Sequence, residues 1–174
     1  GTSTAGVVFG GYSEGYPGHI ALTEEFNGST YSESGDMATA RHYLGGVGTQ
    51  TAASAVGGSN PPPVSALVED YDGTNWTSGT NIPTATSNIR ASGIQTSNLA
   101  FAGYNTALSV KTYEYDGSSW TAKTDMSTAR QEGGNSTQGT TATAFMAGGE
   151  EPAMSNKTEE FTGSTLQAKT VTTS

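Results

Sequence analysis

The hexapeptide YDGTNW occupies residues 71–76, and a near copy, YDGSSW, occupies residues 115–120. Working outward, related turns are found towards both ends of the chain, at Phe26-Asn27-Gly28 and Phe161-Thr162-Gly163. The four aromatic residues that open these turns are 45, 44 and 46 residues apart. Self-similarity at such a period predicts a repeat architecture in which each period is one supersecondary unit. We therefore divide a single domain, 1–174, into units of approximately 1–40, 41–85, 86–129 and 130–174.

Other features recur with the same period. Large residues follow the turn aromatics at Tyr31, Trp76, Trp120 and Leu166, and apolar residues follow at Met37, Ile82 and Met126. Pairs of small residues recur at Gly10-Gly11, Gly57-Gly58, Ala102-Gly103 and Gly148-Gly149. Each unit is predicted to hold four short strands, exemplified by Thr51–Val56, Leu67–Tyr71, a run after Trp76, and a run from near Arg41 to near Gly46. The Asn-Gly and Asp-Gly turns predict type I′ hairpins, in which both central residues have positive φ.

The ordered set of motifs resembles the kelch repeat. One copy is Met37-Ala38-Thr39-Ala40-Arg41, then Gly57-Gly58, then Glu69-Asp70-Tyr71-Asp72, then Trp76; the set returns from Met126-Ser127-Thr128-Ala129-Arg130 onward. The resemblance implies an all-β fold, a β-propeller built of four-stranded antiparallel blades. Three positions depart from the pattern: Thr86 stands near the arginine position, Ala102 in a glycine pair, and Leu166 at the tryptophan position.

The strand that carries the arginine, represented by Arg41–Val47 and Gln131–Thr137, is expected three times, whereas the other three strands are expected four times. One blade therefore lacks a strand, and its exposed edge invites pairing. We expect that strand to come from upstream sequence, from a neighbouring chain, or not at all. A closed four-bladed ring and a portion of a larger ring both remain open.

Composition excludes several classes of partner. The net charge is −9, and only seven lysines and arginines are spread along the chain. Binding to nucleic acid or to an anionic membrane needs clustered cations, so neither is expected. No apolar run approaches the roughly 18 residues of a membrane-spanning helix, so no membrane insertion is expected. The absence of cysteine excludes disulfides and thiolate metal sites.

The loops after the small pairs differ in length and chemistry, while the strands around them repeat. They are Tyr12–Ala21, Ser59–Ala66, Tyr104–Ser109 and Glu150–Asn156. Loops that diverge on a repeated scaffold are natural binding elements. The candidate binding residues are Tyr12, Tyr16, His19 and Tyr104, whose rings can stack and form hydrogen bonds. The alternative interpretation is that the sequences of these loops diverge only because nothing constrains them.

Carboxylates recur at Glu24-Glu25, Glu69-Asp70, Glu114 and Glu159-Glu160. Oxygen ligands of this kind can hold a hard cation. The alternatives are that these acids form a solvated row on one strand face or serve as partners of Arg41, Arg90 and Arg130, and we expect no metal or cofactor. Paired carboxylates also serve glycoside hydrolysis. Their repeat positions favour a structural role, and His19 and His42 lie in different sequence contexts. We therefore expect no catalytic residues and no enzyme.

Units such as Tyr115-Asp116-Gly117-Ser118-Ser119-Trp120 are similar to kelch-like repeats in virion structural proteins of tailed bacteriophages. This resemblance implies a virion or extracellular structural module that assembles with other chains and contacts a host surface or glycan. Two alternatives are a cytoplasmic protein-interaction kelch domain and a propeller that binds or cleaves sugars.

Overall fold

The computed structural model describes residues 1–15, 18–60, 64–137, 139–162 and 165–169, the last range by its backbone alone. The described chain is all-β and forms four antiparallel sheets of three or four strands. The first sheet contains β1 (Gly6–Ser13), β2 (Gly18–Phe26) and β3 (Tyr31–Glu33). The second contains β4 (Gly45–Thr49), β5 (Ala52–Val56), β6 (Val68–Tyr71) and β7 (Trp76–Ser78).

The third and fourth sheets repeat the plan of the second. The third contains β8 (Arg90–Ile94), β9 (Ser97–Phe101), β12 (Thr112–Tyr115) and β13 (Trp120–Ala122). The fourth contains β14 (Gly134–Asn135), β15 (Phe145–Ala147), β16 (Thr158–Thr162) and β17 (Thr165–Lys169). A small hairpin, β10 (Tyr104–Asn105) and β11 (Ala107–Leu108), extends from the third sheet. Within each sheet, strands that follow one another in this order are neighbours.

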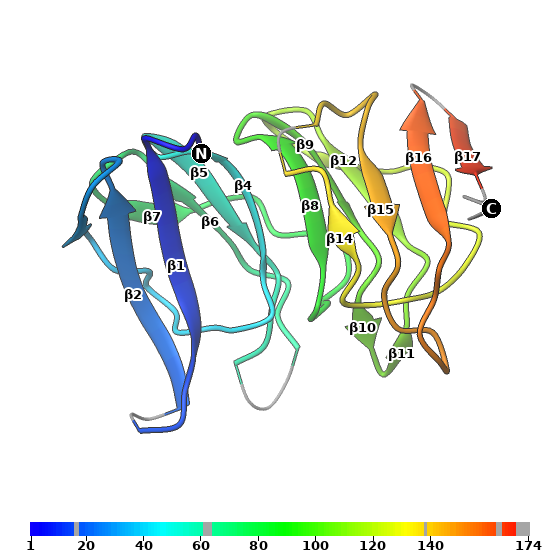
Figure 1. Ribbon diagram of the computed structural model, residues 1–174, viewed down its shortest axis with the longest axis horizontal. Coiled ribbons are helices and arrows are strands. Elements are labelled where there is room, and N and C mark those ends of the chain that lie inside the picture. The colour runs from blue at the N-terminus through cyan, green and yellow to red at the C-terminus, as the bar shows by residue number, and fades with distance from the viewer. Residues whose placement is uncertain (16–17, 61–63, 138, 163–164, 170–174) are drawn as a thin grey trace.

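The four sheets are packed against one another through three apolar clusters, one at each junction. In Figure 1 the first two sheets fill one half of the molecule and the last two the other half, with β4 and β8 side by side near the centre. Each cluster contains the apolar residue predicted to follow the turn: Met37 between sheets one and two, Ile82 between two and three, and Met126 between three and four. Apolar burial at these junctions supplies the main force that holds the sheets together.

Among the described residues the first sheet has three strands rather than four, as the sequence predicted. Its β1 runs into the glycine pair Gly10-Gly11, just as β5 and β9 end at theirs. In the other sheets that strand has a neighbour on its far side, which is β4, β8 or β14. The described first sheet has no counterpart of these three strands, so β1 is an edge strand.

Two details of the predicted strands are wrong. Arg41 does not lie in a strand; β4 begins four residues later, at Gly45, because the segment before it bridges to Ser59 through His42. The turn at Asp72-Gly73 is a hairpin but not type I′, since Tyr71 pairs with Trp76 across four connecting residues. Only the glycine has positive φ, and the Asp72 carboxylate accepts hydrogen bonds from the N–H groups of Thr74 and Asn75.

The glycine pairs explain a departure noted in the sequence. Their first position has φ between 60° and 65° in all four sheets, and Ala102 adopts that left-handed conformation with φ 60°. The second position has φ between 99° and 123° and is glycine every time. An L-residue enters the left-handed α region at a cost of about 1–2 kcal/mol, whereas the wider φ region is essentially closed to side chains. The first position of the third sheet therefore accommodates alanine.

Candidate functional site

A cluster of four aromatic side chains lies at one end of the first two sheets. This is the end that carries the loops after the small pairs, and we call it the loop end. Tyr12 in β1 and His19 in β2 are cross-strand partners, and their ring centroids are 5.7 Å apart. This pair comes from the loop Tyr12–Ala21, part of which forms an extension of the β1–β2 hairpin. Tyr12 is 60% exposed, so its ring is available at the surface.

Backbone hydrogen bonds bring residues of the second sheet to this pair. The N–H of Gly11 donates to the carbonyl of Arg41 at 2.8 Å, and the N–H of Arg41 donates to the carbonyl of Ile20 at 3.3 Å. The next residue, His42, exchanges two backbone hydrogen bonds with Ser59. These contacts fix His42 beside the end of the β1–β2 hairpin.

The two histidines meet directly. Their Nδ1 atoms are 2.7 Å apart, and the Nδ1 atom of His42 is also 3.1 Å from the carbonyl oxygen of Ser59. Because a carbonyl oxygen can only accept, His42 carries its hydrogen on Nδ1, and His19 accepts with an unprotonated Nδ1. Burial lowers the pKa of His42, and the neighbouring His19 lowers it further, while the Ser59 carbonyl opposes both effects.

Tyr43 completes the cluster from an unfavourable backbone conformation. Its ring centroid is 4.1 Å from that of His42, and the side chain is 55% exposed. Its φ is 55°, and the equivalent residues Asn88 and Glu132 also have positive φ. A tyrosine is costlier than an asparagine there, because asparagine tolerates the left-handed region. Strained residues are concentrated at functional sites.

The arrangement is suited to recognition of a ligand. Two exposed phenol rings offer flat apolar faces with a polar edge, and the imidazoles offer hydrogen-bond donors and acceptors between them. Among the described residues, no three His, Cys, Asp or Glu side chains converge in a way that could hold a metal ion.

The structure brings together two of the four predicted binding residues. Tyr12 and His19 share the cluster, whereas Tyr16 lies outside the described residues. Tyr104 lies in β10 of the small hairpin that extends from the third sheet; it is 40% exposed, and its backbone pairs with Ser87. Their roles in binding remain predictions.

Sequence reasoning missed the part of the cluster contributed by His42 and Tyr43. Their position follows from a pairing that the structure repeats in three sheets: the residue after the arginine position pairs with the residue after the small pair, as His42–Ser59, Ser87–Tyr104 and Gln131–Glu150. That pairing places residues 42 and 43 at the loop end.

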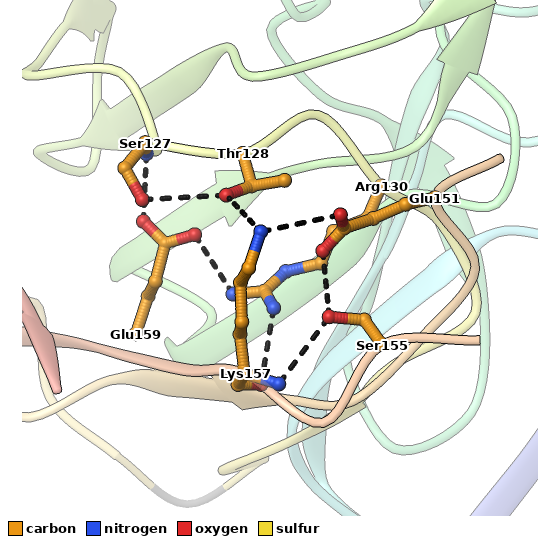
Figure 2. A network of polar contacts seen from close by, with 7 residues as sticks. All are labelled: Ser127, Thr128, Arg130, Glu151, Ser155, Lys157 and Glu159. Carbon is orange, nitrogen blue, oxygen red and sulfur yellow. Dashed lines mark hydrogen bonds and ion pairs between the residues drawn. The ribbon is translucent and has the colours of Figure 1, made fainter. Parts of the chain in front are cut away.

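The repeat carboxylates have structural partners in two sheets. Arg41 donates to Glu69 at 2.9 Å and Arg130 donates to Glu159 at 2.8 Å, and both arginine side chains are fully buried. Figure 2 shows the second pair, with Arg130 also donating to the Lys157 carbonyl. This confirms the interpretation of these acids as arginine partners.

The interpretation is wrong for Arg90, whose Nε donates to the carbonyl of Gly133 rather than to a repeat carboxylate. The third sheet has Thr86 at the arginine position, and there the position of Glu69 is taken by Tyr113. The hydroxyl of Tyr113 is 2.8 Å from that of Thr84. Both members of the ion pair are thus replaced together in this sheet.

An outer polar network covers the Arg130 pair on the loop end of the fourth sheet (Figure 2). Lys157 donates to Glu151 at 3.3 Å, and the Ser155 hydroxyl donates to the same carboxylate at 2.6 Å. The hydrogen bond from Ser155 is the main cause that lowers the pKa of Glu151, and Lys157 lowers this pKa further. This loop is ionic where the loop end of the first two sheets is aromatic.

No family model and no curated protein matches this chain. The described residues contain no helix that is long and apolar enough to cross a membrane.

Proposed function

We propose that this chain is a non-enzymatic structural and binding module, a β-propeller of the kelch type, exposed on a virion or in the extracellular medium. In this proposal the four sheets are blades, other chains of an assembly contact the module, and the loop end contacts a glycan or host-surface receptor. The face-to-face packing of repeated antiparallel sheets is compatible with a propeller.

The observation that carries the proposal is the cluster of Tyr12, His19, His42 and Tyr43. Two of its rings are more than half exposed, although aromatic rings gain free energy on burial. One of them, Tyr43, has a left-handed backbone conformation with φ 55°, which is costly for a tyrosine. Flat rings beside imidazole donors suit a sugar, whose C–H faces stack on rings and whose hydroxyls need hydrogen-bond partners.

No catalytic role is assigned in this proposal. Glu69 and Glu159 each engage a buried arginine, which leaves them unsuited to proton transfer. The two histidines have each other and a backbone carbonyl as hydrogen-bond partners.

A glycan array probed with the labelled chain tests the proposal. We expect selective binding by the wild type, and loss of that binding in Tyr12→Ala/Tyr43→Ala. Tyr31→Ala is the matched control, because Tyr31 is 58% exposed but lies in β3, away from the cluster. A hydrolysis assay on each bound glycan should yield no product, and release of a cleaved sugar would contradict the non-enzymatic proposal. A virion structure in which neighbouring chains bury the cluster would contradict its contact with a host.

A further inference from the structure

One repeat carboxylate, Glu24 in β2, lacks the arginine that its counterparts have. It stands two residues before the turn aromatic, as Glu69 and Glu159 do. Those two are buried against arginines, whereas Glu24 is exposed and its carboxylate has no hydrogen-bond or ion-pair partner among the described residues.

The arginine and the missing strand belong to one segment. In the second and fourth sheets the arginine precedes the strand on the far side of the sheet by four residues, from Arg41 to β4 and from Arg130 to β14. The described part of the chain supplies neither part of this segment to the first sheet. The third sheet provides the contrast, because it has neither the arginine nor the glutamate, whereas the first keeps the glutamate alone.

The carboxylates around Glu24 are poorly compensated. Glu24 is directly opposite Glu33 across the β2–β3 ladder, a pairing of like charges that disfavours the sheet. The counterparts of Glu33 are neutral, with Ser78 opposite Glu69 and Ala168 opposite Glu159. Asp36 lies beside them, and a hollow of about 140 Å³ is lined by all three acids and by Leu22. A guanidinium placed there would offset this excess of negative charge.

A second hollow lies along the open edge. It has a volume of about 330 Å³, and its walls are Val7, Val8 and Phe9 of β1 on one side and Gly46–Gly48 of β4 on the other. Val8 is 55% exposed. Gly1 also lines this hollow, and its amino group donates to the carbonyl of Gly48 at 3.3 Å. The edge strand β1 offers an extended chain unpaired backbone N–H and C=O groups.

We propose that this edge is a docking site for an extended segment of a partner polypeptide, which carries an arginine four residues before a glycine-rich strand. The strand pairs with β1, and the arginine reaches Glu24 and its neighbouring acids. The partner is not a second folded copy of this chain, because Arg41 and Arg130 are each fully buried in their own sheets. Addition of a strand to a sheet edge is an established mode of peptide recognition.

A synthetic peptide with the sequence MSTARQEGGNST, taken from residues 126–137, tests the proposal. We expect saturable binding by fluorescence anisotropy, together with new protection of β1 amides from hydrogen exchange. Replacing the peptide's arginine by alanine should weaken binding at least ~10-fold, because it removes the charge-assisted hydrogen bonds to Glu24 and its neighbouring acids. A proline at the peptide residue that corresponds to Gly134 should weaken it similarly, because proline blocks strand pairing.

Glu24→Gln in the protein should reproduce the loss seen with the alanine peptide, whereas the matched control Glu114→Gln in the third sheet should leave binding unchanged. Glu24 is exposed, so its replacement does not disturb the core. Absence of binding to the folded wild type, or binding that ignores the peptide's arginine, would overturn the proposal. So would a dimer of the chain, measured by sedimentation, that Glu24→Gln dissociates, because a second copy would then be the occupant.

Discussion

The Nδ1 atoms of His19 and His42 lie 2.7 Å apart, and this contact joins the first sheet to the second. It requires one donor and one acceptor, so it holds only while at least one imidazole is neutral. Tyr12, Tyr43 and the Ser59 carbonyl are the other groups that face the pair, and no carboxylate contacts it among the described residues.

The histidine contact makes stability depend on pH. Because the pKa of His42 is lowered from its usual 6.5 in the folded chain, its contribution to the free energy of unfolding is complete above that value. The contribution is lost as pH falls through the lowered folded pKa. Urea unfolding at several pH values between about 7.5 and 5 should show this decrease. His42→Asn keeps a donor without a titrating ring, so its stability should change less over that range; an unchanged slope would contradict the assignment.

Removal of one partner of the buried ion pair in the fourth sheet should lower the free energy of unfolding more than removal of both. Arg130→Ala leaves the Glu159 carboxylate buried and unpaired, and we expect a loss of about 3–5 kcal/mol in the free energy of unfolding. Arg130→Met/Glu159→Leu should lose much less, because it removes both charges. Denaturant titration of the two variants measures this difference, and equal losses would show that the charges are not coupled.

The two positions of a glycine pair should respond differently to alanine. Gly57→Ala should cost at least about 1–2 kcal/mol, the usual cost of a left-handed L-residue, and Ala102 already adopts the equivalent φ. An added Cβ meets a backbone carbonyl at both positions, 2.7 Å from Thr86 at Gly57 and 2.8 Å from His42 at Gly58, so φ decides the ranking. Gly58→Ala should cost more, on the order of 3 kcal/mol beyond that shared contact, because its φ of 101° lies in a region essentially closed to side chains. Thermal unfolding of both variants tests this ranking, and the reverse order would contradict it.

Tyr43 should show a conflict between stability and binding. In Tyr43→Asn the residue matches Asn88, which adopts φ 50° at the equivalent position. Relief of left-handed strain should raise the free energy of unfolding by up to about 1 kcal/mol. The same variant should bind any glycan selected on the array more weakly. If Tyr43→Asn instead lowers both the free energy of unfolding and the binding, Tyr43 has a packing role and the prediction is wrong.

The parts of the fold that were predictable from sequence are those set by repetition. Glycine pairs, turn aromatics and their spacing indicated four sheets and the missing strand. The type I′ turn was wrong because the Asp72 side chain itself accepts the N–H groups of the turn, a local competition that the Asp-Gly signal does not reveal. Half of the aromatic cluster was missed because His42 and Tyr43 reach Tyr12 only through hydrogen bonds between sheets.

The central claim is that each repeat forms one sheet and that the described residues supply only three strands to the first sheet. Amide hydrogen exchange, resolved by residue with NMR, tests it most directly. Alternate amides of β1 should exchange at least ~100-fold faster than the corresponding amides of β5 and β9, because those strands are paired on both sides and open only with larger unfolding. Equal protection along all three strands would contradict the claim.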